Sequence, residues 1–276
     1  MTTGQPTDQQ LVGMLDEVWR SIEDLGATLS EEEWKRATEC PGWTVQDNLV
    51  HLTALERFIL GDPLPSEDVA DDLPHVKNDI GKANERWIAS RRSWSGADAL
   101  AEFHTATRER VEQLRALEPS GFDADSWTPM GPGTVRSLLP FRIFDSWVHG
   151  QDMRGALGRV GDLDSAAAEQ SIGMMVDVLP YVVGKKSGAP DGSTVVLTLT
   201  GPLARSVAVE MVEGRARATD VVPLDATVTL TVDTGEYARL ACGRHDPADA
   251  IARGTVGIDG DTELGVRVVH HLNYMF

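Results

Sequence analysis

The side chains best suited to chemistry lie in residues 141–158, FRIFDSWVHGQDMRGALG, where Asp145 and His149 stand four apart in an otherwise apolar run. Four residues turn a helix through about 400°, so these two side chains lie almost one above the other. A carboxylate and an imidazole on a buried face are costly unless they are paired, hydrogen-bonded or bound to a metal. The spacing alone is compatible with a mutual hydrogen bond and with a metal site.

A third candidate ligand is His51, which lies among leucines and valines in DNLVHLTALERF. If its helix packs against the helix of Asp145 and His149, two nitrogens and one carboxylate oxygen meet. Such a set suits zinc with a fourth position open for water or a thiol, as in catalytic zinc sites. Nickel and iron accept the same ligands, so the residues leave the identity of the metal open.

The elements that must position these side chains are helices over the first two thirds of the chain. Apolar residues at helical spacing predict helices over 7–30, 44–61, 77–117 (as one helix or two), 134–158 and 164–184, with a surface loop over 118–133. Thr44 with Asp47 is typical of an N-terminal cap. Pro140 is expected to begin or kink the main body of the fourth helix.

The pattern changes near residue 187. Three stretches rich in β-branched residues and alternating in polarity follow, over 194–201, 206–214 and 226–233, then two helical segments, a short strand over 255–260 and a final segment. We therefore expect two domains, an all-helical domain over 1–187 and a smaller α+β domain over 188–276. The total of 276 residues accommodates both.

Composition excludes several classes of function. Acidic residues outnumber basic ones by 43 to 25, giving a formal net charge of −18, which opposes binding to nucleic acid or to an anionic membrane. Only two cysteines occur, Cys40 and Cys242, without a CxxC motif, so no disulfide framework is expected. Neither a signal peptide nor a transmembrane segment is visible, so a cytoplasmic location is the default expectation.

The stretches CPGWTVQDNLVHL and FRIFDSWVHGQDMRGALG together resemble the mycothiol-dependent maleylpyruvate isomerase family. The resemblance implies a DinB-like four-helix bundle with a metal held at the positions that match His51, Asp145 and His149. The isomerases carry glutamate where this chain has Asp145, which bears on the reaction subtype more than on metal binding. Residues 226–276 are similar to the family's C-terminal module, a sterol-carrier-like α+β domain.

The resemblance also implies chemistry. The cofactors would be zinc, or another divalent metal, and mycothiol, a low-molecular-weight thiol. Zinc coordination deprotonates a thiol, and the thiolate adds to a small-molecule electrophile, either in a cis–trans isomerase or in an S-transferase. Asp152 could orient a liganding histidine. Arg154 could hold a substrate carboxylate or part of the thiol. For both residues an ordinary ion pair at a helix end is an equally good interpretation.

An anionic substrate requires positive groups in so acidic a protein, and the second domain supplies arginines. Arg239 and Arg244, on either side of Cys242, are the candidates we select for a catalytic contribution. Two other functions stay open. The chain could be a non-enzymatic carrier of a lipid or another small molecule, or a metal-dependent hydrolase that activates water in place of a thiol. The sequence predicts no oligomeric state.

Overall fold

The computed structural model describes residues 6–70, 72–219 and 221–275, and their contacts divide the chain into two units at Asp162. The first unit is helical and the second combines helices with a sheet, which confirms the predicted fold class. The division falls well before the predicted boundary at 187. The reason is that the segment after Leu163 packs within the second unit, where helix α7 (Ala166–Asp177) contacts α9 (Thr234–Ala241).

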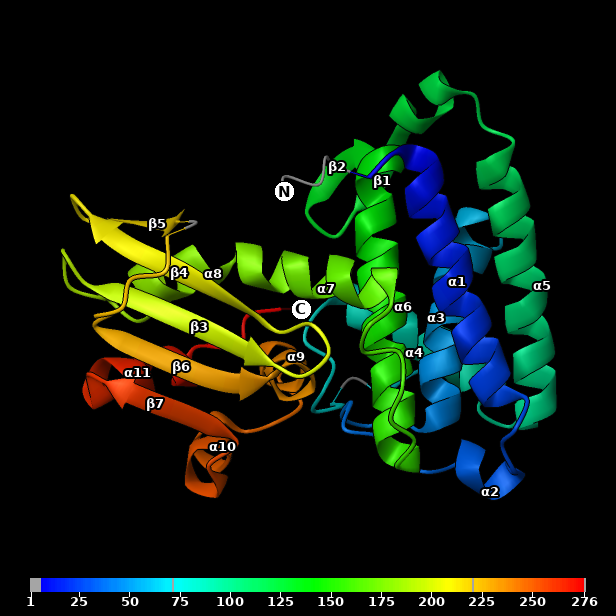
Figure 1. Ribbon diagram of the computed structural model, residues 1–276. Helices are drawn as coiled ribbons and strands as arrows, with labels where there is room; N and C mark the ends of the chain where they lie inside the picture. The colour runs from blue at the N-terminus through cyan, green and yellow to red at the C-terminus, as the bar shows by residue number, and fades with distance from the viewer. Residues whose placement is uncertain (1–5, 71, 220, 276) are drawn as a thin grey trace. The chain divides into compact units, whose positions relative to one another are not determined.

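The first unit is a four-helix bundle. Helix α1 (Asp8–Gly26) and helix α3 (Val45–Ile59) each pack against both α5 (Gly96–Arg115) and α6 (Val135–Leu157), as Figure 1 shows. Two shorter helices, α2 (Glu31–Trp34) and α4 (Asp79–Arg91), contact α3. The predicted segment 77–117 is thus two helices, α4 and α5. The core of the bundle includes Leu15, Trp19, Ile22, Leu49, Leu52, Phe103, Leu114, Leu139, Ile143 and Trp147.

Local sequence signals explain where the two site-bearing helices begin. Thr44 caps α3 and its side chain accepts from the backbone N–H of Asp47, whose carboxylate in turn accepts from the Thr44 backbone N–H, as predicted. Helix α6 begins at Val135 behind a similar cap at Thr134 and continues through Pro140. The start agrees with the helix predicted over 134–158; of the two predictions for Pro140, the structure shows that it does not begin the helix, while a kink at this residue stays a prediction.

The predicted loop 118–133 contains a short turn of 3-10 helix (Pro119–Asp123) and a two-stranded hairpin. Strands β1 (Asp125–Thr128) and β2 (Gly131–Thr134) pair antiparallel and lead directly into α6. The two strands of this hairpin have four residues each and together contain two glycines and a proline. The sequence therefore shows no alternating pattern that would predict the hairpin.

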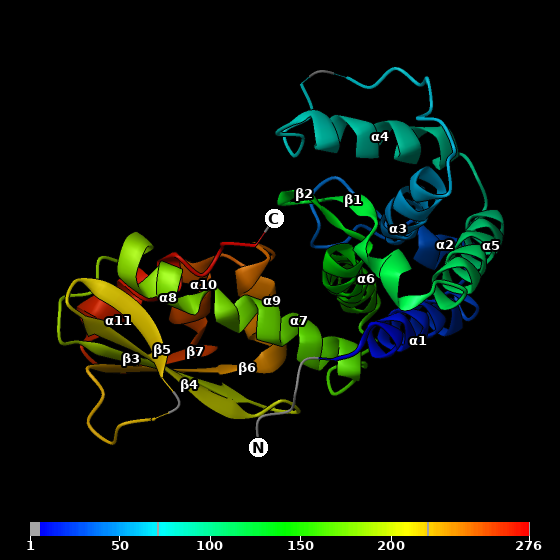
Figure 2. The same cartoon turned by 90° about the horizontal axis from the view of Figure 1, so that it is seen from above.

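The second unit contains a five-stranded sheet in which the strands lie in the order β5-β4-β3-β6-β7. The strands β3 and β6 pair parallel, and every other neighbouring pair is antiparallel. Helices α8, α9 and α11 contact the strands and lie on one side of the sheet (Figure 2). The bounds are β3 (Thr194–Thr200), β4 (Arg205–Val212), β5 (Arg215–Thr219), β6 (Val228–Asp233), β7 (Val256–Gly260), α8 (Leu179–Tyr181), a π turn (Val182–Lys186), α10 (Pro247–Arg253) and α11 (Thr262–His270).

Among the residues that the structure describes, no helix combines the length and the apolar character needed to cross a membrane.

Candidate metal site

Helices α3 and α6 bring the three predicted ligands together in the bundle. The Nε2 atom of His51, on α3, lies 3.5 Å from Oδ1 and 3.4 Å from Oδ2 of Asp145, on α6. One turn further along α6, Nε2 of His149 lies 3.5 Å from the same Oδ1 atom. The two imidazole rings meet edge to face with their centroids 4.8 Å apart. A single carboxylate oxygen therefore faces both imidazole nitrogens.

Burial and charge set the protonation states of the three groups. Both histidines are buried, whereas the side chain of Asp145 is partly exposed. Burial lowers the pKa of His51, which favours the neutral imidazole that metals bind. Burial alone would raise the pKa of Asp145, but its interactions with the adjacent His51 ring and with the Arg142 guanidinium outweigh it and hold that pKa well below its ordinary value. The cluster thus contains an ionised carboxylate beside a neutral imidazole.

His149 is held from behind by two further side chains. Its Nδ1 atom lies 2.7 Å from Oδ1 of Asn48 and 3.1 Å from Oδ2 of Asp152. Burial alone would lower the pKa of His149, but hydrogen bonds to Asp145 and Asp152 outweigh it and raise the pKa. With the Nδ1 proton donated to these oxygens, Nε2 is directed at Asp145. Asp152 thus lies where the sequence analysis placed it, against a candidate ligand.

The geometry fits a metal ion better than it fits hydrogen bonds alone. The separations of 3.4–3.5 Å exceed the usual length of a hydrogen bond. They approach the spacing of about 3.3 Å between neighbouring ligand atoms around a tetrahedral zinc ion. In addition, Nδ1 of His51 is buried and has no hydrogen-bond partner among the described residues. A cation at Nε2 would leave this Nδ1 atom without a partner, so it is the long separations between Nε2 and Asp145 that favour a cation here.

Trp43 forms an aromatic wall beside the cluster. The centroid of its ring lies 4.9 Å from that of His51 and 5.5 Å from that of His149. The indole Nε1 donates to Oε1 of Glu85, on α4, at 2.6 Å, and His75 contacts the same oxygen at 2.9 Å. Neither Trp43 nor Glu85 was predicted to lie at the site, because their proximity to it depends on how α4 packs.

A second group of potential ligands shares His149. It consists of Cys40, His149 and Asp152, which offer ligand atoms within 4.8 Å of one another. Cys40 lies in the turn that leads to α3, and it was not predicted to take part in the site. The ligand atoms of His51, Asp145 and His149 likewise lie within 4.8 Å of one another.

Behind Asp145 lies a buried ionic network that the sequence analysis missed. The guanidinium of Arg142 contacts Asp145 through Nη1 and donates through Nε to Oε1 of Glu56, on α3, at 2.7 Å. The other Glu56 oxygen lies 3.4 Å from Nε of Arg110, on α5. Arg142 and Asp145 are three apart on one helix, a spacing that signals contact between them. No sequence signal indicates that Glu56 and Arg110, from other helices, complete the network.

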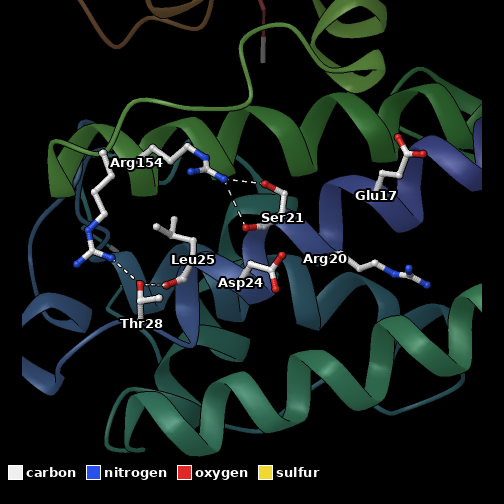
Figure 3. Close-up of a pocket in the computed structure, with 8 residues that line it drawn as sticks. Glu17, Arg20, Ser21, Asp24, Leu25, Thr28 and Arg154 are labelled. Atoms are coloured by element: carbon white, nitrogen blue, oxygen red, sulfur yellow. Dashed lines mark hydrogen bonds between the residues drawn. The ribbon is translucent and has the colours of Figure 1, made fainter.

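Arg154 does not join the candidate ligands. It points toward α1, where its Nη2 donates to the Ser21 hydroxyl at 2.7 Å (Figure 3). The same Nη2 atom lies 3.6 Å from a carboxylate oxygen of Asp162. It lines an open pocket of about 570 Å³ between α1 and the end of α6, with Asp24 and Arg159 among the other residues. Five residues of helix separate Arg154 from His149, which directs the two side chains to different faces of α6.

The two other predicted arginines belong to the second unit. Arg239 lies in the last turn of α9, and Arg244 follows that helix and donates to the backbone carbonyl of Cys242 at 2.8 Å. Their predicted catalytic contribution stays a prediction.

Comparisons with known proteins bear on both units. The profile of the mycothiol maleylpyruvate isomerase N-terminal domain matches residues 15–154, and the profile of the C-terminal domain of the same proteins matches residues 171–267. The chain belongs to the mycothiol-dependent maleylpyruvate isomerase family. The matched N-terminal region contains all three candidate ligands, together with Asp152 and Arg154.

The individual proteins that this chain resembles are distant from it in sequence. The crystal structure of the mycothiol-dependent maleylpyruvate isomerase shares its fold with a TM-score of 0.52, at 17% identity, over 87% of this chain and 90% of that one. An uncharacterized protein of Mycobacterium tuberculosis is 24% identical over 137 residues. That match includes 50% of this chain and 52% of the relative, so the chain spans about half the length of the curated relatives it matches.

Proposed function

We propose that His51, Asp145 and His149 bind a divalent metal ion, zinc before others, and that the site activates mycothiol for addition to an unsaturated electrophile. The observation that carries this proposal is the shared Asp145 Oδ1 atom, 3.5 Å from both imidazole nitrogens. Membership of the family supports the choice of thiol. A metal bound here would lower the pKa of a coordinated thiol, so that the thiolate is present at neutral pH.

The chain's own residues would prepare the site in distinct ways. Asn48 and Asp152 fix the His149 ring, so that Nε2 faces the position the cation would take. The Trp43 ring, held by Glu85, covers both imidazoles and limits the access of water. The partial exposure of Asp145 leaves one side of the cluster within reach of small molecules.

The chemistry proposed is reversible addition. The thiolate adds to one carbon of a conjugated cis double bond, and the electron pair moves toward the neighbouring carbonyl group. Rotation about the resulting single bond and loss of the thiolate give the trans isomer and return the thiol. If the adduct instead takes up a proton and is released, the reaction is an S-transfer. Both reactions share the first step, and Asp145 in place of glutamate leaves the subtype to experiment.

The test is turnover by the zinc-loaded protein, with maleylpyruvate as the first electrophile and with and without mycothiol. We expect turnover that requires both zinc and the thiol and that is lost in His149→Ala. His104→Ala is the matched control, because His104 is largely exposed on α5 and should leave activity unchanged. Hydrolysis without any thiol would favour the hydrolase, and a bound lipid without turnover would favour the carrier; either result contradicts the proposal.

A further inference from the structure

The carboxylate of Asp145 has two different environments, one at each oxygen. Oδ1 faces Nε2 of both His51 and His149 at 3.5 Å. Oδ2 also lies 3.4 Å from Nε2 of His51, but unlike Oδ1 it is engaged by Nη1 of Arg142, in a charge-assisted hydrogen bond. A carboxylate can bind a metal ion through one oxygen or through both. Which of these occurs depends on whether Oδ2 is available.

Arg142 is held so that it cannot release Oδ2 without cost. Its side chain is 3% exposed, and its Nε donates to Oε1 of Glu56, whose side chain is 1% exposed. The far oxygen of Glu56 faces Arg110 from α5, at 3.4 Å. Four charges of alternating sign thus run from Arg110 to Asp145 across three helices. Moving Arg142 away would break the shorter of the two ion pairs of Glu56, at 2.7 Å, and leave that buried carboxylate only the longer contact with Arg110, which is unfavourable.

We propose that Arg142 is a positioning residue that restricts Asp145 to one-oxygen binding of the metal and so keeps a coordination position open for the thiol. This inference rests on the proposed function. A carboxylate that binds through both oxygens would take up the position that an incoming thiolate needs. Glu56 acts through Arg142, by accepting from its Nε and so fixing the direction of the guanidinium.

The experiment replaces zinc with Co²⁺, whose visible absorption is strong in four-coordinate sites and weak when the coordination number rises. The probe thiol is 2-mercaptoethanol, which adds a sulfur-to-cobalt absorption band on binding. In Arg142→Met we expect unchanged cobalt stoichiometry, a weaker visible spectrum and a dissociation constant for the thiol raised by at least about tenfold. Arg142→Lys should restore part of the thiol affinity, because one donor remains.

The matched control is Arg110→Met, which removes the same charge from the same network without touching Asp145. It should lower stability and leave both the cobalt spectrum and the thiol affinity as in the wild type. A purely structural role for Arg142 predicts that the two variants behave alike. Should Arg142→Met fail to fold, the double variant Glu56→Gln with Arg142→Met serves, because it removes opposite charges together and leaves Arg110 its hydrogen bond to Gln113.

The outcomes separate the two proposals. Wild-type spectrum and thiol affinity in Arg142→Met would overturn this inference and leave the proposed function intact. Failure of the wild-type protein to bind Co²⁺ or zinc would overturn the proposed function and this inference with it.

Discussion

Glu56 is the residue whose charge should matter most to the stability of the helical unit. It is fully buried, and its two oxygens face Arg142 at 2.7 Å and Arg110 at 3.4 Å. Replacement by glutamine conserves the volume and one acceptor for Arg142. It removes the negative charge between two buried guanidinium groups, so their mutual repulsion is then offset only by Asp145, on the far side of Arg142.

The expected cost follows from the burial of all three side chains. Removing one partner of a buried ion pair costs about 3–5 kcal/mol, and the acceptor that glutamine retains places Glu56→Gln near 3 kcal/mol. That is a large part of the roughly 5–15 kcal/mol by which a domain is stable. For a unit of this size it corresponds to a fall in melting temperature of about 6–12 °C.

The assay is urea unfolding followed by tryptophan fluorescence. All seven tryptophans lie in the first unit, so the signal reports on the bundle alone. Glu109→Gln is the matched control: Glu109 pairs with Arg57 at the surface, with half of its side chain exposed, and should cost less than about 1 kcal/mol. If Glu56→Gln costs no more than Glu109→Gln, the buried network does not stabilise the bundle as reasoned here.

Three further predictions follow from other parts of the structure. Asp152→Asn should weaken zinc binding by about 10- to 100-fold, because it removes the charge that orients His149, and competition with a chelating dye would measure it. Burial raises the pKa of Tyr237 well above its ordinary value, so an unfolded chain ionises near pH 10 while the folded one stays neutral. Stability of the second unit should therefore fall above pH 10 by about 1.4 kcal/mol per pH unit for this tyrosine, and Tyr237→Phe, followed by calorimetry from pH 9 to 11, should show a shallower decline. Gly158 ends α6 at φ +65° with open space around it, so Gly158→Ala should cost about 1 kcal/mol in the urea assay; no loss would mean that the left-handed cap is unimportant.

The parts of the fold that depend on local sequence were predictable. Apolar spacing indicated the bundle helices, and the cap at Thr44 indicated the start of α3. The short polar elements were not predictable from the sequence. Strand β5 (Arg215–Thr219) alternates arginine only with alanine and has a single β-branched residue, so no strand was predicted there. The contacts divide the chain at Asp162, before the predicted boundary at 187, because α7 packs against α9 although its composition is that of a bundle helix.

In the candidate site, too, the residues indicated by local sequence were predictable and those brought together by helix packing were not. His149 and Asp145 are neighbours on one helix, so their spacing indicated the pair, and an apolar setting singled out His51 on another helix. The supports come from side chains far apart in sequence: Asn48 on His149, and Glu56 on Arg142. Their contacts depend on the rotation of each helix about its axis, which a single sequence does not specify.

The measurement that tests the central claim most directly is the zinc content of the purified protein, determined by elemental analysis beside His51→Ala and His149→Ala. We predict close to one equivalent in the wild type and loss of most of it in both variants, with the helical content of all three proteins unchanged by circular dichroism. A wild-type protein that binds no zinc when zinc is supplied, or variants that bind as much as the wild type, would contradict the assignment of His51, Asp145 and His149 as ligands.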